Sequence, residues 1–241
     1  MTDYRDRIIL ALDFGTPEEA YRCLEQLEGH VRYVKVGMEL FYAAGPAIVA
    51  RMKERGFNVF VDLKVHDIPN TAQGAMRSLA QLGADMVNCH VAGGIKMMAA
   101  AREGLEQGTP SGSPRPLLIG VTMLTSTSQE TMNNELLIPG AVEQTVTAYA
   151  QFAKQAGMDG VVASPLEVPL IKGACGTSFV TVTPGIRPAG AAKGDQTRVT
   201  TPEEALITLA CDYIVIGRAI TAANDPQAAW QSVLDSLKAS K

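Results

Sequence analysis

The sequence predicts an α/β protein, a (β/α)8 barrel formed as one domain over residues 1–241. Eight short apolar runs alternate with helix-like segments along the chain, which is the pattern of repeated βα units. A length of 241 residues suits such a barrel as a single domain. The doubly wound alternative is weaker, because no G-x-G-x-x-G follows the first run and no P-loop motif is present.

The expected strands are apolar runs rich in β-branched residues. In chain order they cover residues 8–12, 33–36, 57–61, 85–90, 117–123, 160–164, 179–183 and 213–216. Short, nearly continuous apolar runs are typical of parallel strands that are buried on both faces. The eight runs therefore predict the inner wall of the barrel.

Helix-like segments follow nearly all of these strands. Residues 16–19 and 201–204 both read Thr-Pro-Glu-Glu, in which threonine is the N-cap, proline the first helical residue and the second glutamate completes a capping box. Further helices are expected over about 46–55, 71–82 and 142–156, after Gly93 and Gly94, and around Trp230. This alternation supports a parallel barrel.

Composition narrows the functional class. Hydrophobic residues make up 46% and charged residues 19%, which is ordinary for a soluble globular enzyme. A net charge of −4 gives no reason to expect nucleic acid or an anionic membrane as partner. We expect a cytoplasmic protein, because no targeting segment or apolar span of about 20 residues is visible. The scattered cysteines also suit a reducing compartment: Cys23, Cys89, Cys175 and Cys211.

The most informative stretch is Asp-Leu-Lys-Val-His-Asp at residues 62–67, directly after the third expected strand. Because strand residues alternate between faces, Asp62 and Lys64 are expected to point the same way. Asp67 follows just past the turn. Three charges at the exit of an apolar strand are costly unless they pair with each other or with a ligand. A solvated salt-bridge cluster is the simpler interpretation.

The active site of such a barrel lies at the carboxyl ends of its strands. Asp13 and Lys35 end strands next to Asp62 and Lys64, so the four predict a row in which each charge favours the charged form of its neighbours. Further polar residues at strand ends are Thr122 and Thr125, with His90 and Ser164 interpreted as hydrogen-bonded rim residues and Thr183 as the cap of its strand.

Gly217 and Arg218 follow the eighth strand, where many barrels bind phosphate. Glycine lets a backbone N–H approach an anion, and arginine offers a planar fork of donors. Arg187 lies in the loop over 184–200, whose glycines suit a lid, although a plain surface loop fits the composition too. The ligand implied is a small phosphorylated molecule.

Together these motifs resemble the bacterial orotidine 5′-monophosphate decarboxylases. The segments that carry the resemblance are residues 11–13, 34–39, 62–71, 121–126, 183–187 and 216–218, and they span nearly the whole chain. D-x-K-x-x-D alone also occurs in related sugar-phosphate barrels. Its combination with K-V-G-M-E-L, the Leu-Thr-Ser loop and T-P-G-I-R is far more specific.

The resemblance implies decarboxylation of orotidine 5′-monophosphate to UMP, the last step of de novo pyrimidine synthesis, with no cofactor and no metal. It makes Lys64 the general acid that protonates carbon 6 of the pyrimidine. Asp62 would lie against the substrate carboxylate, and Lys35 and Asp62 would hold Lys64 in place.

The resemblance also implies a homodimer in which Asp67 and Thr71 reach the partner's site. The remaining residues would bind the substrate. Asp13 and Lys35 would bind the ribose, Thr125 the pyrimidine edge, and Gln196 both the base and the phosphate. Arg187, Arg218 and the Gly217 amide would bind the phosphate, and Pro184 would also lie in the site.

Two alternatives remain. A metal-dependent sugar-phosphate decarboxylase or aldol-type synthase of the same barrel typically carries a carboxylate at the end of strand two to bind Mg²⁺. Here Lys35 occupies that position and would repel the ion. A non-catalytic nucleotide-binding barrel would be expected to have lost part of the charged row, yet all its members are present.

Overall fold

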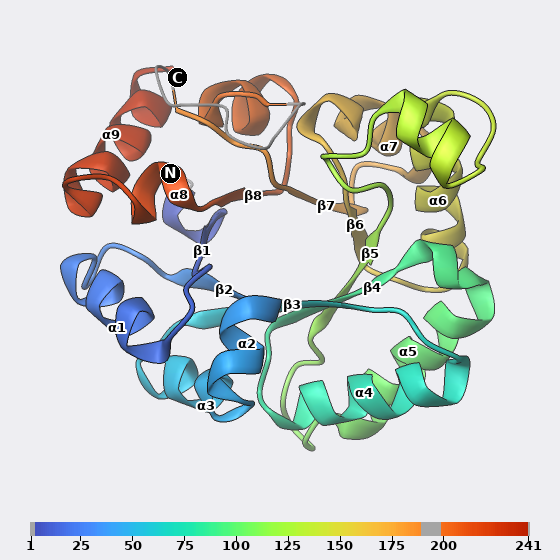
Figure 1. Cartoon of the computed structure of the whole chain (residues 1–241), viewed down its shortest axis with the longest axis horizontal. Helices are drawn as coiled ribbons and strands as arrows, with labels where there is room; N and C mark the ends of the chain where they lie inside the picture. Colours follow the sequence, from blue (N-terminus) through green and yellow to red (C-terminus); the bar gives the residue numbers. More distant parts are fainter. Residues whose placement is uncertain (1–2, 189–198, 241) are drawn as a thin grey trace.

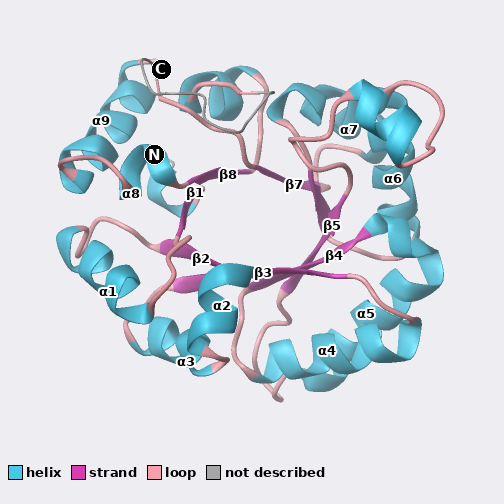
Figure 2. Cartoon of the chain, viewed as in Figure 1, coloured by secondary structure: helices cyan, strands magenta, loops and turns pink. Residues whose placement is uncertain are grey.

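The computed structural model describes residues 3–188 and 199–240. Eight parallel strands close into a barrel in chain order, and β8 pairs with β1. Figure 1 looks along this barrel, and Figure 2 shows the ring of strands inside an outer layer of helices. The predicted (β/α)8 fold is therefore confirmed.

All eight predicted strands are found. Strands five and six each end two residues earlier than predicted, and the third continues to Val65, through the charged motif. The strands are β1 (Ile8–Ala11), β2 (Tyr33–Gly37), β3 (Asn58–Val65), β4 (Met86–His90), β5 (Leu117–Val121), β6 (Gly160–Val162), β7 (Val180–Thr183) and β8 (Tyr213–Ile216).

The predicted helices are α1 (Pro17–Gln26), α3 (Ala47–Glu54), α4 (Pro69–Gln81), α5 (Gly94–Gly108), α6 (Val142–Gln155) and α9 (Pro226–Ala239). The sequence did not predict α2 (Met38–Ala44), α7 (Val168–Cys175) or α8 (Arg218–Thr221). The segment after Thr201 contains a π-helical turn, Glu204–Thr208. Other single turns are Tyr4–Asp6, Val91–Gly93, Thr131–Glu135 and Pro165–Glu167.

The cap of α1 differs in one bond from the prediction. The Thr16 hydroxyl accepts a hydrogen bond from the Glu19 amide, as expected of an N-cap. The Glu19 carboxylate, however, accepts from the Thr16 hydroxyl at 3.1 Å, whereas a full capping box would join it to the Thr16 amide. One orphan amide of the first turn is thus satisfied by this pair.

The core has two layers that follow from strand alternation. One layer fills the barrel, and the other lies between strands and helices, where Trp230 is fully buried. The inner layer consists of Ile9, Ala11, Tyr33, Phe60, Met86, Ile119, Val182 and Val215. Lys35 and Asp62 come two positions after Tyr33 and Phe60, so they continue the inward-facing positions toward the carboxyl end.

At the amino end of the barrel, an aspartate precedes each of β4, β6 and β8. Each carboxylate accepts a hydrogen bond from a backbone amide of the preceding strand and also forms an ion pair with a lysine or arginine. The same arrangement recurs at every second strand. The pairs are Asp85 with Val59 N, Asp159 with Leu118 N and Asp212 with Thr181 N, each at 2.7 Å, and the cations are Lys53, Arg115 and Lys172.

Replacing Asp159 with alanine is expected to lower the free energy of unfolding by about 1–3 kcal/mol, because the buried Leu118 amide loses its acceptor. Urea unfolding measures the change, and kcat should stay unaltered because this end of the barrel is remote from the strand ends that carry chemistry. Asp235→Ala, which removes an exposed i,i+3 pair with Lys238, is the control and should change little. Equal stability of the two variants would show that the bond from the Leu118 amide to Asp159 does not stabilise the barrel.

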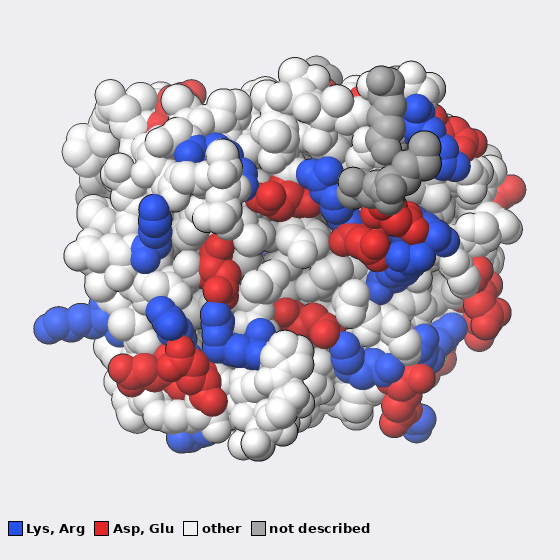
Figure 3. Space-filling view, turned by 180° about the vertical axis from the view of Figure 1, so that it is seen from behind, with Lys and Arg blue, Asp and Glu red and all other residues white. Residues whose placement is uncertain are grey.

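Surface charge is mixed in sign. Figure 3 shows basic and acidic side chains interspersed over the face in view. Within residues 3–188 and 199–240, no helix is long and apolar enough to cross a membrane.

Candidate active site

A cavity of about 300 Å³ opens at the carboxyl ends of the strands. Its walls come from strand ends and from the loops that follow them. Nine of the predicted site residues line it: Asp13, Lys35, Asp62, Lys64, Thr125, Pro184, Arg187, Gly217 and Arg218. The barrel thus brings together residues that are far apart in sequence.

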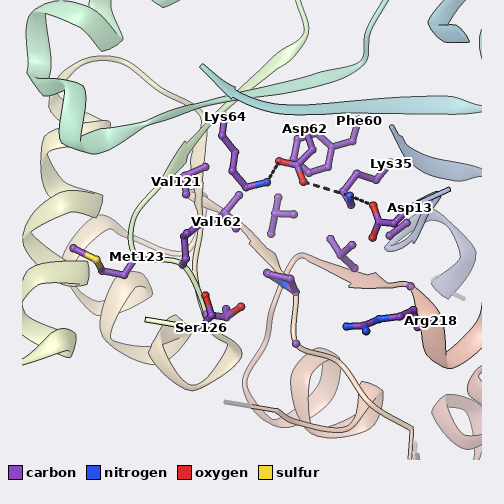
Figure 4. A pocket seen from close by; sticks show the side chains of 18 of the residues that line it. Asp13, Lys35, Phe60, Asp62, Lys64, Val121, Met123, Ser126, Val162 and Arg218 are labelled. Carbon is purple, nitrogen blue, oxygen red and sulfur yellow. Dashed lines mark hydrogen bonds and ion pairs between the residues drawn. The ribbon is translucent and has the colours of Figure 1, made fainter. Parts of the chain in front are cut away.

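Four charged side chains form a continuous row along one wall. Lys64 Nζ lies 2.8 Å from Asp62 Oδ1, and the other oxygen of Asp62 lies 3.5 Å from Lys35 Nζ. Lys35 Nζ in turn donates to Asp13 Oδ1 at 2.8 Å. Figure 4 shows these three contacts as dashed lines. The structure therefore contains the alternating row that the sequence predicted.

The two buried members of the row, Lys35 and Asp62, favour each other's charged form. Burial alone would raise the pKa of Asp62, but Lys35 and Lys64, with hydrogen bonds from Lys64 and Asn88, lower it below its usual value. Burial likewise opposes the charge of Lys35, yet the carboxylates of Asp62 and Asp13 raise its pKa. Lys35 and Asp62 are each only 8% exposed, so little water screens this pair.

Lys64 does not follow regular strand geometry. Its φ is 49°, in the left-handed region that costs a non-glycine residue roughly 1–2 kcal/mol. The pairing of β3 with β4 also shifts register between Val61 and Val65. The two side chains lie side by side, as predicted, but regular strand alternation is not what brings Lys64 to Asp62. They meet because a bulge re-aims Lys64.

Gly37, the last residue of β2, lies opposite Asp62 in the sheet. A Cβ atom there would sit 2.9 Å from Lys35 Nζ, closer than Cβ atoms approach other atoms, and 3.1 Å from Asp13 Oδ1, so both side chains would have to shift. The hydrogen bond between Lys35 and Asp13 therefore depends on the absence of a side chain at residue 37.

Gly37→Ala is expected to lower kcat/KM by about 10²-fold, the effect of displacing a positioned group by roughly 1 Å. The melting temperature should change little, because the Lys35 ammonium is the end of a flexible chain and can move aside. Gly173→Ala on α7, where no atom lies within 4 Å of the added Cβ, is the control. Unchanged kcat/KM in the Gly37 variant would show that the bond between Lys35 and Asp13 is dispensable.

The remaining predicted residues lie elsewhere. Asp67 and Thr71 are exposed and do not line this chain's cavity; Asp67 accepts a hydrogen bond from the Ile68 amide. Gln196 falls outside the described residues. Thr183 donates to the Tyr213 carbonyl at 3.0 Å, in keeping with a capping role.

Of the other strand-end residues, His90 is half-buried, with its ring 5.4 Å from that of His66. Burial and the neighbouring His66 and Lys64 lower the pKa of His90. The Ser164 side chain is fully buried.

Two arginines also line the cavity. Arg218 begins α8, directly after Gly217, and Figure 4 shows it at the Asp13 end of the row, away from Lys64. Arg187 lines the same cavity and donates to the Ile186 carbonyl at 2.9 Å. The cavity therefore offers guanidinium groups to an anion and, separately, an ammonium and a carboxylate to a reacting group.

Sequence reasoning did not assign several of the residues that line or support the cavity. Phe60 and Ser126 line the cavity, and Asn88 bonds to Asp62 from outside it. The sequence did contain a signal for Asn88, because it is a polar residue in the middle of a mostly apolar strand. Among the residues that the structure describes, no group of three or more His, Cys, Asp or Glu side chains is placed to hold a metal ion.

Comparison with known proteins gives a consistent result. A family model described as "Orotidine 5'-phosphate decarboxylase / HUMPS family" matches residues 6–233. The orotidine 5′-phosphate decarboxylase of Halalkalibacterium halodurans is 56% identical over 226 residues, which are 94% of this chain and 96% of the relative. That of Lactococcus lactis subsp. cremoris is 53% identical over 229 residues, covering 95% and 96%.

Solved structures agree. The orotidine 5′-phosphate decarboxylase of Lactobacillus acidophilus superposes with a TM-score of 0.85 at 40% identity, covering 96% of this chain and 98% of the other. An uncharacterized conserved protein from Geobacillus kaustophilus also gives 0.85, at 48% identity and coverage of 95% and 99%.

Proposed function

The chain belongs to the orotidine 5′-phosphate decarboxylase / HUMPS family, and on this premise we propose how its residues act. It is a carboxy-lyase that converts orotidine 5′-phosphate to UMP and carbon dioxide, the last step of de novo pyrimidine synthesis. The observation that supports our assignment of roles is the row from Asp13 to Lys64 in a cavity also lined by two arginines.

Lys64 is the proposed general acid. Loss of carbon dioxide leaves a carbanion at carbon 6 that no carbonyl conjugates with directly, so its charge must be stabilised electrostatically. An ammonium held 2.8 Å from Asp62 is already oriented, and it meets the developing charge without solvent reorganisation. It then delivers its proton to carbon 6, which gives UMP.

Asp62 and Lys35 prepare this step. Asp62 lies against the substrate carboxylate, where its negative charge favours departure of carbon dioxide and is relieved as the carboxylate leaves. Lys35, together with Asp62, keeps the ammonium of Lys64 in place. The lowered pKa of Asp62 keeps it ionised at neutral pH, which this role requires.

The other lining residues bind the substrate. Asp13 and Lys35 contact the ribose hydroxyls, Thr125 contacts the pyrimidine edge, and Pro184 completes the wall. Phosphate is bound by Arg187, Arg218 and the Gly217 amide, and Gln196 bridges base and phosphate. Binding energy from the distant phosphate orients the base over the charged row and so contributes to the rate.

The active form is a homodimer in the cytoplasm. Asp67 and Thr71 complete the partner's site, which is consistent with their exposure outside this chain's own cavity. Ile68, between them, is 67% exposed, an apolar side chain suited to an interface. All four cysteines are reduced and buried, as suits a reducing compartment.

Mixed dimers test the shared site. Asp67→Ala and Lys64→Ala are each expected to be inactive alone, because every site in either homodimer lacks one group. Mixing the two proteins with subunit exchange should restore activity, since one site in each mixed dimer is then complete. The measurement is carbon dioxide release after mixing, with size-exclusion chromatography to follow the dimer. No recovery despite exchange would place Asp67 outside the partner's site.

The reaction is tested by following ultraviolet absorbance as the purified chain consumes orotidine 5′-phosphate, with and without EDTA. We expect full turnover in the chelator. Activity that collapses in EDTA and returns with Mg²⁺ would favour the metal-dependent sugar-phosphate enzymes instead. Binding of UMP without release of carbon dioxide would favour a non-catalytic nucleotide-binding barrel.

A further inference from the structure

The register of β3 and β4 shifts where β3 carries Asp62 and Lys64. From Val61 to Val65, β3 advances four residues, whereas its partner β4 advances two, from Val87 to Cys89. Three residues of β3, Asp62 to Lys64, therefore face the single residue Asn88. Regular ladder hydrogen bonds cannot continue through such a mismatch, so the backbone groups of the bulge need other partners.

Asn88 supplies one such partner from inside the barrel and also bonds to a side chain of the bulge. Its side-chain oxygen accepts a hydrogen bond from the Lys64 amide at 2.8 Å, and its nitrogen donates to Asp62 Oδ1 at 2.7 Å. Only this orientation of the side-chain amide satisfies both bonds, because a backbone N–H must donate and a carboxylate must accept. The residue is 1% exposed and does not line the cavity.

The two bonds act on the two groups that the reaction uses. One secures the backbone of Lys64 in a conformation that a non-glycine residue adopts only under constraint. The other bonds the same oxygen of Asp62 that receives the Lys64 ammonium, so the carboxylate is fixed from both sides. Without Asn88 the Lys64 amide would lose its acceptor, and the bulge would be expected to relax.

We propose that Asn88 is a positioning residue of the decarboxylase: it fixes the Asp62 carboxylate and the Lys64 backbone together, so that the Lys64 ammonium reaches carbon 6. This inference rests on the proposed roles of Asp62 and Lys64. It adds that Asp62 and Lys64 are not sufficient by themselves, because both depend on hydrogen bonds to a residue of β4.

Asn88→Ala removes both bonds and is expected to lower kcat by about 10²-fold, the effect of a misplaced reacting group. The dissociation constant of UMP should stay within about threefold, because ribose and phosphate contacts are untouched. Thr181→Val is the matched control: its buried hydroxyl also makes two hydrogen bonds, both to Asp212, at the opposite end of the barrel. It should lower the melting temperature and leave kcat unchanged.

Asn88→Asp tests positioning through the pH dependence of kcat, which would not change if Asn88 only stabilised the fold. The introduced carboxyl group is close to isosteric, and when protonated it can accept from the Lys64 amide and donate to Asp62, as the native amide does. When ionised it repels Asp62. The ratio of variant to wild-type kcat should therefore be highest at low pH and fall as pH rises. The near-native shape also keeps the test usable if the alanine variant does not fold.

Wild-type turnover of orotidine 5′-phosphate is measured first. Its absence would refute the proposed function, whereas a test of Asn88 requires an active wild type. With wild type active, a reduced kcat of Asn88→Ala, or of Asn88→Asp with the expected pH trend, supports the proposal. Kcat within about threefold of wild type and a pH-independent ratio in the folded variants would overturn it.

Discussion

Lys64→Ala is expected to lower kcat by more than about 10⁴-fold. Removing one preorganised electrostatic group commonly costs about 10²–10³ in rate, and losing the proton donor costs about another 10²–10⁴. Binding of UMP should change by less than about tenfold, because ribose and phosphate are held by other side chains. Single-turnover assays of carbon dioxide release and calorimetric titration with UMP measure the two quantities separately.

Lys53→Ala is the matched control for this change. Lys53 also pairs with an aspartate, Asp85, at 2.6 Å, but it does so at the amino end of the barrel. Its loss should affect stability and leave kcat intact, which separates the removal of an ion pair from the removal of a reacting ammonium. Near-normal decarboxylation by Lys64→Ala would reject the general-acid role.

Arg218→Ala is expected to raise KM by about 10- to 150-fold, because a hydrogen bond to a charged group contributes about 1.5–3 kcal/mol. Steady-state kinetics with orotidine 5′-phosphate measure the change, and kcat should fall by a smaller factor. The reason is distance from the reacting group: Arg218 lies at the Asp13 end of the pocket, away from Lys64, so its loss weakens binding more than it slows the reaction step.

The substrate itself provides a control. Orotidine without its phosphate has no group for Arg218 to bind, so Arg218→Ala should leave kcat/KM for orotidine unchanged. Arg102→Ala, which removes an exposed pair with Glu106 on α5, should alter neither substrate's kinetics. An unchanged KM for the phosphorylated substrate would remove Arg218 from the phosphate site.

Local patterns were enough to predict much of this molecule. Strand positions followed from short apolar runs, because burial on both faces selects β-branched residues wherever the strand lies. The caps at Thr16 and Thr201 were readable because an N-cap bond spans only three residues. The row of Asp13, Lys35, Asp62 and Lys64 followed from one further rule, that strand ends converge in a barrel.

Other features were not readable from local pattern. The short helix α2 begins directly at the end of β2, and α8 is only four residues long, so neither shows enough turns to display a helical period. The first four residues of α7 are all apolar, Val-Pro-Leu-Ile, and so short an apolar run does not distinguish a helix from a strand.

The sequence by itself determined the eight strands, the inward-facing charges and the family to which the chain belongs, because each rests on residues that are neighbours or repeat at a fixed spacing. Only the tertiary structure decided the register shift between β3 and β4, the left-handed backbone of Lys64 and the two hydrogen bonds of Asn88. The physical reason is that register depends on contacts between strands 24 or more residues apart, where the hydrogen-bonding partner of each group is set by the closed barrel and not by the adjacent sequence.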